Sequence, residues 1–308
     1  MSLTREQTLA RLGHRLEELA VVPAVVARLS VLDPDAADFP SAVLELTAAD
    51  PPLALRLIGA ANRAAVAARH PIESIPAAIA QIGAREAASL ITALSVVEVF
   101  VPRSVGQRNL WIHAIQVAVT ARTIAQVRPD LEVDPEHAYL AGLLHDVGRF
   151  VMFAKTPAEL GEVDESRYGC GDELRTAELA ICGIDHAELG WHACRHWALP
   201  DRVAMLIRDH HVYDLARHDK TPPELRPLVR VVQEADVLSF LMLIDAALAA
   251  RPTEELRWMI GARLAEVGAR EPPVGADTLV SRLPSIDRTA RELVDLVLPP
   301  PAPQVQPS

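Results

Sequence analysis

The sequence predicts an all-α protein, and three observations lead to this fold class. Ala and Leu outnumber the aromatic and β-branched residues, and glycine is scarce at 14 of 308 residues, a composition that favours helices over sheets. Apolar residues recur at helical spacing along most of the chain. No stretch of useful length alternates as a strand does. Because hydrophobic residues make up 50% of the chain, it can bury one large core or two modest ones.

Capping signals place the predicted helices. Thr4 and Gln7 form a capping box in front of an apolar stripe. Asp50 before Pro51 is an N-cap followed by a first-turn proline, and Ser74 opens another helix in the same way. Further helices are predicted at 86–99, 109–127, 134–145, 175–182, 186–197, 201–211, 223–249, 254–267 and 287–296.

The distribution of histidine divides the chain into the parts that we expect. Most of the 11 histidines lie between residues 105 and 250. Residues 155–172 hold Pro, Gly and many charges, and predict a loop with room for a short helix. The expected parts are an N-terminal helical lobe (1–104), a histidine-rich helical lobe (105–250), C-terminal helices (251–298) and a disordered Pro-rich tail (299–308).

Charge and cysteine content narrow the classes of partner. Lys and Arg number 30 and Asp and Glu number 41, a net charge of −11, so duplex nucleic acid is not an expected partner. Cys170, Cys182 and Cys194 contain no CxxC pair and predict free thiols in a reducing compartment. No apolar run reaches the length of a membrane span, so no membrane partner is expected. Together these features predict a cytoplasmic protein.

The segment 142–149 holds the strongest chemical signal, the adjacent residues His145 and Asp146. An imidazole and a carboxylate at one helix end can share a metal ion, and the carboxylate can bridge to a second ion. Other histidines and one aspartate fall on separate predicted helices, where they can complete an inward-facing site in a helical bundle. The candidate metal ligands are His113, His145, Asp146, His186, His210, His211 and Asp236.

Several segments resemble the HDOD family, a signalling offshoot of the HD superfamily of metal-dependent phosphohydrolases. The order of the candidate ligands is similar to that of the HD-GYP branch of this superfamily. The segments that carry the resemblance are Leu19–Leu29, Asp50–Asn62, Ile75–Gly83, Leu110–His113, Glu178–Gly190, Trp197–Pro200 and the doublet His210-His211.

The resemblance implies two functions of different classes. HDOD members are usually described as non-catalytic, which implies a regulatory module that acts through a protein partner in a signalling pathway. The alternative is a metal-dependent phosphohydrolase, in which Asp146 is catalytic and Arg149 holds a phosphorylated small molecule or nucleotide. The ligand types suit one or two divalent ions of Fe, Mn, Zn or Ni. Residues 212–215 stand where the HD-GYP branch has its DGxGYP loop, so hydrolysis of cyclic-di-GMP is not expected.

Most candidates also have a structural alternative. Arg149 can cap a helix end, and a lone buried histidine such as His113 is more often hydrogen-bonded than metal-bound. Neighbours on a helix differ by about 100°, so one of His210 and His211 is expected to point away from a shared centre. An unpaired Asp236 in an apolar stretch would be costly to bury, which favours a metal or histidine partner. All four tryptophans are expected to pack in the core.

Overall fold

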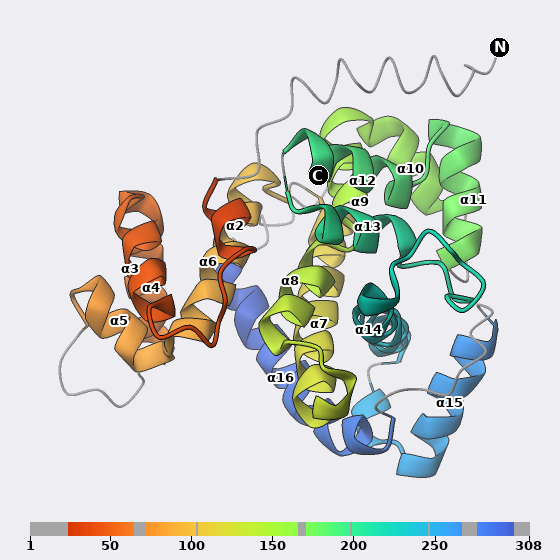
Figure 1. The fold of residues 1–308 in the computed structure, drawn as a ribbon. Coiled ribbons are helices and arrows are strands. Elements are labelled where there is room, and N and C mark those ends of the chain that lie inside the picture. Colours follow the sequence, from red (N-terminus) through yellow and green to blue (C-terminus); the bar gives the residue numbers. More distant parts are fainter. Residues whose placement is uncertain are drawn as a thin grey trace, which may run out of the picture.

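The structure, a computed structural model, describes residues 24–64, 72–102, 104–165, 171–197, 199–245, 247–266 and 276–298. Within these ranges every regular element is a helix and none is a strand, which confirms the all-α prediction. Figure 1 shows helices α2 to α6 gathered beside a larger group that contains α7 to α16. The helix expected after Thr4 and the tail 299–308 lie outside the described residues.

The α-helices are α2 (Ala24–Leu29), α3 (Phe39–Ala48), α4 (Pro51–Ala64), α5 (Ile75–Ile82), α6 (Ala84–Val99), α7 (Val105–Val127), α8 (Pro135–Leu144), α9 (Val147–Lys155), α10 (Pro157–Glu165), α11 (Gly171–Cys182), α12 (His186–His196), α13 (Asp201–Asp209), α14 (Arg226–Ile244), α15 (Thr253–Glu266) and α16 (Ala276–Val297). Short 3-10 helices are η1 (Pro129–Leu131), η2 (Pro223–Leu225) and η3 (Leu248–Ala250).

Side-chain caps start several of these helices where the sequence predicts them. Ser74, Asp134 and Asp185 each accept a hydrogen bond from a backbone N–H of the first helical turn. The N–H of Leu53 donates to Asp50 at 3.1 Å. Such bonds satisfy amides that a helix start leaves unpaired. Two of these caps matter for the site, because they fix the start of α8, which leads into His145, and the start of α12, which begins at His186.

Helix α7 is the centre of the larger group, and α8, α14 and α16 pack along it (Figure 1). Trp111 of α7 is fully buried, and its ring centroid lies 4.4 Å from that of Phe150 on α9. Its indole N–H donates to the carbonyl of Phe100 at 2.9 Å. A large buried ring with a satisfied N–H is a strong anchor. It holds the part of α7 that carries His113.

Two parts of the helical prediction differ from the structure. Helix α9 begins directly after Asp146, so Gly148 lies inside a helix, whereas α10 is the short helix for which the expected loop at 155–172 left room. Helix α16 begins at Ala276 instead of residue 287, with Pro284 inside it. Buried Leu283 continues its apolar face next to the proline, and one missing N–H does not outweigh that burial.

Three further expectations concern the surface and the thiols. Trp258 of α15 is 71% exposed, so the expectation that all four tryptophans pack in the core is wrong. Cys182 and Cys194 are unpaired, as predicted, and Cys170 lies outside the described residues. Within the described part of the chain, no helix is both long enough and apolar enough to cross a membrane. The division at residue 104 stays a prediction, and α16 contacts both α6 and α7.

Candidate metal centre

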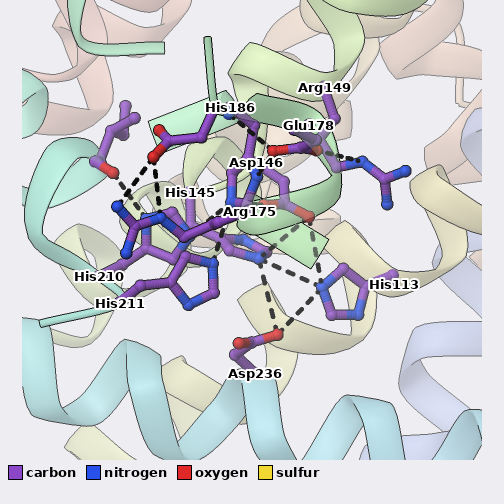
Figure 2. Close-up of polar contacts among 12 residues, drawn as sticks. His113, His145, Asp146, Arg149, Arg175, Glu178, His186, His210, His211 and Asp236 are labelled. Atoms are coloured by element: carbon purple, nitrogen blue, oxygen red, sulfur yellow. Dashed lines mark hydrogen bonds and ion pairs between the residues drawn. The ribbon is translucent and has the colours of Figure 1, made fainter. Parts of the chain in front are cut away.

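The seven candidate ligands come from separate helices and meet at one place in the core (Figure 2). Their positions are His113 on α7, His145 directly after α8, Asp146 in the turn before α9, His186 at the start of α12, His210 and His211 directly after α13, and Asp236 on α14. The structure therefore brings together every residue that the sequence singled out as a ligand.

One half of the site, the α7–α14 half, consists of His113, His145 and Asp236. Nε2 of His113 lies 3.2 Å from Nε2 of His145 and 3.2 Å from Oδ1 of Asp236. Nε2 of His145 lies 3.9 Å from the same carboxylate oxygen. These three atoms are close enough to one another to bind one ion.

The other half, the α12–α13 half, consists of His186, His210 and His211. Nε2 of His186 lies 3.3 Å from Nε2 of His210 and 3.0 Å from Nε2 of His211. The expectation that one of the doublet turns away is wrong, because both rings direct Nε2 toward His186; the doublet follows the end of α13 at Asp209. The two rings of the doublet lie side by side, with centroids 4.0 Å apart.

Asp146 lies between the two halves and presents one oxygen to each. Its Oδ2 lies 3.7 Å from Nε2 of His113 and 3.6 Å from Nε2 of His145. Its Oδ1 lies 3.3 Å from Nε2 of His186 and 3.8 Å from Nε2 of His210. Asp146 is thus the residue that both halves share.

Backbone carbonyls orient two of the rings through their other nitrogen. Nδ1 of His145 donates to the carbonyl of Gly142 at 2.7 Å, and Nδ1 of His210 donates to that of Ile207 at 2.6 Å. A carbonyl oxygen only accepts hydrogen bonds, so the ring proton of each neutral imidazole is on Nδ1. The Nε2 atom of each then presents a lone pair to the centre.

Two residues that the sequence analysis missed orient further rings. Glu178 of α11 is fully buried, and its Oε2 accepts from Nδ1 of His186 at 2.6 Å and from the backbone N–H of the same residue at 2.9 Å. The hydroxyl of Ser239 lies 3.0 Å from Nδ1 of His113 and donates to Oε1 of Gln116 at 2.9 Å. Glu178 begins one of the segments that resemble the HDOD family, which was the one available signal for it.

The spacing of the Nε2 atoms fits ligands that share a cation. Two ligands bound at about 2.1 Å from one ion lie roughly 3.0 to 3.4 Å apart for right-angle to tetrahedral geometry. The three Nε2–Nε2 distances of 3.2, 3.3 and 3.0 Å fall in this range. Neutral imidazoles whose lone pairs face one another at this distance repel each other unless a cation lies between them. The donor set therefore fits bound metal.

The electrostatics favour the protonation states that metal ligands need at Asp146, His210 and His211. Burial acts to raise the pKa of Asp146, but the imidazoles of His145 and His186 outweigh it and hold that pKa well below its usual value. Burial lowers the pKa of His210 to about 3 and brings the pKa of His211 well below its usual value. Metal ligation requires an ionised carboxylate and neutral imidazoles, which is the state that these three groups adopt near neutral pH. Burial also acts to lower the pKa of His113 and His186, but the facing carboxylates outweigh it and raise those two pKa values.

Arg149 lies in α9 beside the centre and contacts two carboxylates. Its Nη2 lies 2.5 Å from Oδ1 of Asp164, and its Nε lies 3.4 Å from Oε1 of Glu178. Because the residue is inside a helix, the alternative that it caps a helix end is wrong. Arg149 thus contacts both Glu178, which orients His186, and Asp164, which lines a cavity. Its role as a phosphate ligand stays a prediction.

That cavity has a volume of about 350 Å³ and opens above the metal ligands. His113, Asp146, His211 and Asp236 lie at its floor, and its walls come from helices that include α7, α9, α14 and α15. Small-molecule sites in proteins typically have volumes of about 300–1,000 Å³. The candidate ligands are therefore within reach of a small molecule.

The sequence pattern of the HDOD domain matches residues 19–213. The chain belongs to the HDOD family. The HDOD match contains six of the seven candidate ligands, and only Asp236 lies beyond it. The segment that follows the match, which supplies α14 and α15, therefore completes both the centre and the wall of its cavity.

Solved structures share the HDOD fold. An HDOD domain protein of unknown function from Geobacter sulfurreducens aligns at a TM-score of 0.69 and 24% identity, over 94% of this chain and 98% of that one. A candidate phosphohydrolase from Shewanella amazonensis SB2B aligns at 0.66 and 21% identity, over 93% and 97%. An uncharacterized protein from Treponema pallidum (strain Nichols) is 23% identical over 230 residues, which are 74% of this chain and 43% of that relative. The chain thus spans less than half the length of the Treponema relative.

Proposed function

We propose that this HDOD chain binds two divalent metal ions and hydrolyses a phosphate ester at them. The position of Asp146 carries this proposal. Its Oδ2 faces His113 and His145, and its Oδ1 faces His186 and His210. A carboxylate that offers one oxygen to each of two ligand sets can bridge a pair of ions, as two-metal hydrolytic sites require.

Each half of the centre supplies a ligand set for one ion. The α7–α14 half would hold one ion with Oδ2 of Asp146, and the α12–α13 half would hold the other with Oδ1. Ligation by imidazole and carboxylate suits Fe, Mn, Zn or Ni better than ions that prefer thiolate. When bound, such ions supply Lewis acidity toward phosphoryl oxygens and lower the pKa of a coordinated water.

The chain's own residues position the substrate and set the charge of the site. Asp146 is buried and Asp236 is half-buried, and both line the cavity, where their negative charge would offset part of the charge of the ions. Arg149 lines the cavity beside them, within reach of a phosphate oxygen. Because Asp146 and Arg149 are buried, their charge interactions are stronger than they would be at the surface.

Metal analysis and a phosphoesterase assay test the proposal. We expect the full chain, purified without chelators or an affinity column, to hold two ions of Fe, Mn, Zn or Ni and to hydrolyse p-nitrophenyl phosphate or its bis ester. Asp146→Ala should lose both properties. Asp287→Ala is the matched control, because Asp287 bonds Arg291 within α16, a helix that carries none of the candidate ligands. Absence of metal would contradict the whole proposal, and bound metal without turnover would contradict hydrolysis.

Regulation through a protein partner is the second candidate function, and helix α8 favours it. At the start of α8, Glu136 accepts hydrogen bonds from Ser89 of α6 at 2.6 Å and from Arg122 of α7 at 2.9 Å. The other end of α8 leads into His145 and Asp146. The helix thus joins α6 to the metal ligands. Protection of α6 amides from hydrogen exchange on metal binding would support this function, and unchanged exchange there would contradict it.

A further inference from the structure

The outer part of the cavity has an apolar wall that the HDOD match does not include. Val237, Phe240 and Leu243 of α14 line it, and all three follow residue 213, where the match ends. Leu110 of α7 and Phe153 of α9 also line the cavity. A floor of metal ligands therefore meets a wall made mainly of carbon atoms.

Two phenylalanine side chains on this wall are only partly buried. Phe153 and Phe240 retain solvent-accessible surface and both line the cavity. An aromatic ring gains free energy when its exposed surface is covered. A ligand that enters the cavity and covers these rings would gain this free energy as affinity.

Helix α15 adds a planar cation to the same wall. The guanidinium carbon of Arg263 lies 4.8 Å from the ring centroid of Phe240, a cation–π contact. Nη1 of Arg263 also lies 2.7 Å from Oε2 of Glu266, so its positive charge is offset by a carboxylate. Arg263 therefore offers the cavity a flat surface beside a ring rather than a strong positive charge.

Two arginines that line the cavity are already paired with carboxylates. This pairing disfavours a ligand whose organic group is very hydrophilic. Arg149 and Arg263 line the cavity, and each has a carboxylate partner, Asp164 and Glu266 respectively. A sugar would have to exchange water for apolar atoms along much of the wall, which is unfavourable for its hydroxyls. A planar apolar group loses nothing in that exchange.

We propose that the ligand of this site is a phosphate ester whose organic group is an aromatic ring system. Its phosphate lies on the metal floor, and its ring lies against Phe240 and Phe153, with Arg263 at the edge. Phe240 is then the main residue that selects the organic group. The inference rests on the proposed function to the extent that the metal ions bind the phosphate.

Binding of non-hydrolysable phosphonates to the metal-loaded full chain tests the proposal without turnover. By isothermal titration calorimetry, 3-phenylpropylphosphonate should bind at least about tenfold more tightly than propylphosphonate, as expected for burial of a ring. It should also bind more tightly than 3-cyclohexylpropylphosphonate, which is apolar but not planar. Equal affinity for the phenyl and propyl compounds, or tighter binding of the cyclohexyl compound, would overturn the proposal.

Variants show whether the preference arises at this wall. Phe240→Ala should reduce the phenyl-to-propyl affinity ratio to about threefold or less while the metal content stays unchanged. Arg263→Gln, a milder change, should reduce the ratio in part and serves if Phe240→Ala folds poorly. Trp258→Ala is the matched control, because this aromatic residue of α15 is exposed and does not line the cavity. A ratio that both wall variants leave unchanged would overturn the proposal.

The outcome also separates this inference from the proposed function. Hydrolysis of p-nitrophenyl phosphate together with equal binding of the phenyl and propyl phosphonates would leave the hydrolase standing and remove the aromatic ligand. Preferential binding of the phenyl compound without any turnover would keep the ligand class and remove hydrolysis. Failure of both phosphonates to bind the metal-loaded chain would overturn the inference, whatever the result of the hydrolysis assay.

Discussion

The α7–α14 half and the α12–α13 half of the centre each orient one histidine through a backbone carbonyl, but they hold their other histidines by different means. In the α7–α14 half, a neutral hydroxyl, that of Ser239, holds His113. In the α12–α13 half, the buried carboxylate of Glu178 holds His186, while Nδ1 of His211 has no hydrogen-bond partner among the described residues. In the α7–α14 half, neutral groups thus hold Nδ1 of both histidines. In the α12–α13 half, a carboxylate holds His186 firmly, whereas no described residue holds Nδ1 of His211.

The two halves also differ in whether their second carboxylate is a candidate ligand or lies behind one. Asp236 is itself a candidate ligand of the α7–α14 half, whereas the α12–α13 half has only histidines and receives its carboxylate through His186 from Glu178. A carboxylate behind a histidine raises the basicity of that ligand. Both halves thus have one carboxylate besides Asp146. We expect the α7–α14 half to prefer a harder ion such as Mn, because carboxylate is the harder ligand.

The largest expected effect is that of Asp146, which both halves share, compared with that of Asp236, which belongs to one half. Asp146→Ala removes the one carboxylate that faces both halves, so both ions should be lost. Asp236→Ala should remove only the ion of the α7–α14 half. Metal content per chain, measured by inductively coupled plasma mass spectrometry, should fall from two to none and from two to one. Equal losses in the two variants would contradict the division into halves.

The next effect concerns the backbone beneath the α12–α13 half. A Cβ atom on Gly148 would lie 1.9 Å from the carbonyl oxygen of His186 and 2.8 Å from N of Gly190. Gly148→Ala should therefore push α12 away, lower the free energy of unfolding by about 1–3 kcal/mol and release the ion of that half. Gly261→Ala is the control, because a Cβ there meets open space. Denaturant unfolding and metal content measure both effects, and a stable Gly148→Ala variant with two ions would refute the expectation.

The two orienting residues should differ in effect. Glu178→Gln removes the charge behind His186 and should weaken one ion by roughly 10- to 100-fold, as is typical of such second-layer carboxylates. Ser239→Ala removes one neutral hydrogen bond from His113, about 1 kcal/mol or roughly fivefold. Competition with a chromophoric chelator measures both affinities. Equal effects would show that the contrast between a carboxylate and a hydroxyl is unimportant here.

The smallest effect tests the loosely held ligand. A Cβ atom on Gly171 would lie 2.6 Å from Cε1 of the His211 ring. Because no bond at Nδ1 fixes this ring, it can rotate aside at a cost of about 0.5–1 kcal/mol. Gly171→Ala should therefore weaken the ion of the α12–α13 half only two- to fivefold, measured by the same competition. Complete loss of that ion would show that His211 is held as firmly as His186.

Much of the centre was predictable because its ligands are rare residue types in a fixed order, and because caps such as Asp134 and Asp185 announce their helices locally. Glu178 and Ser239 were not predictable from local pattern, since a glutamate on a helix is usually exposed and a serine usually caps. The orientation of His211 depends on where α13 ends. Tertiary packing determines where α13 ends, and residue spacing along the sequence does not predict it. The cavity wall likewise depends on how α15 lies against Phe240.

The separation of the ligands along the chain has a consequence for how the protein matures. Between His113 and Asp236, loop closure across several helices must precede assembly of a complete ligand set, and the unfolded chain keeps only the adjacent pair His145 and Asp146 together. Under the proposed function, metallation is therefore a late step that follows the packing of the helices. Ions that bind the folded state and hardly the unfolded one would shift the folding equilibrium by mass action. The folded fraction of the proposed metalloprotein would then depend on the free concentration of the ion as well as on the sequence.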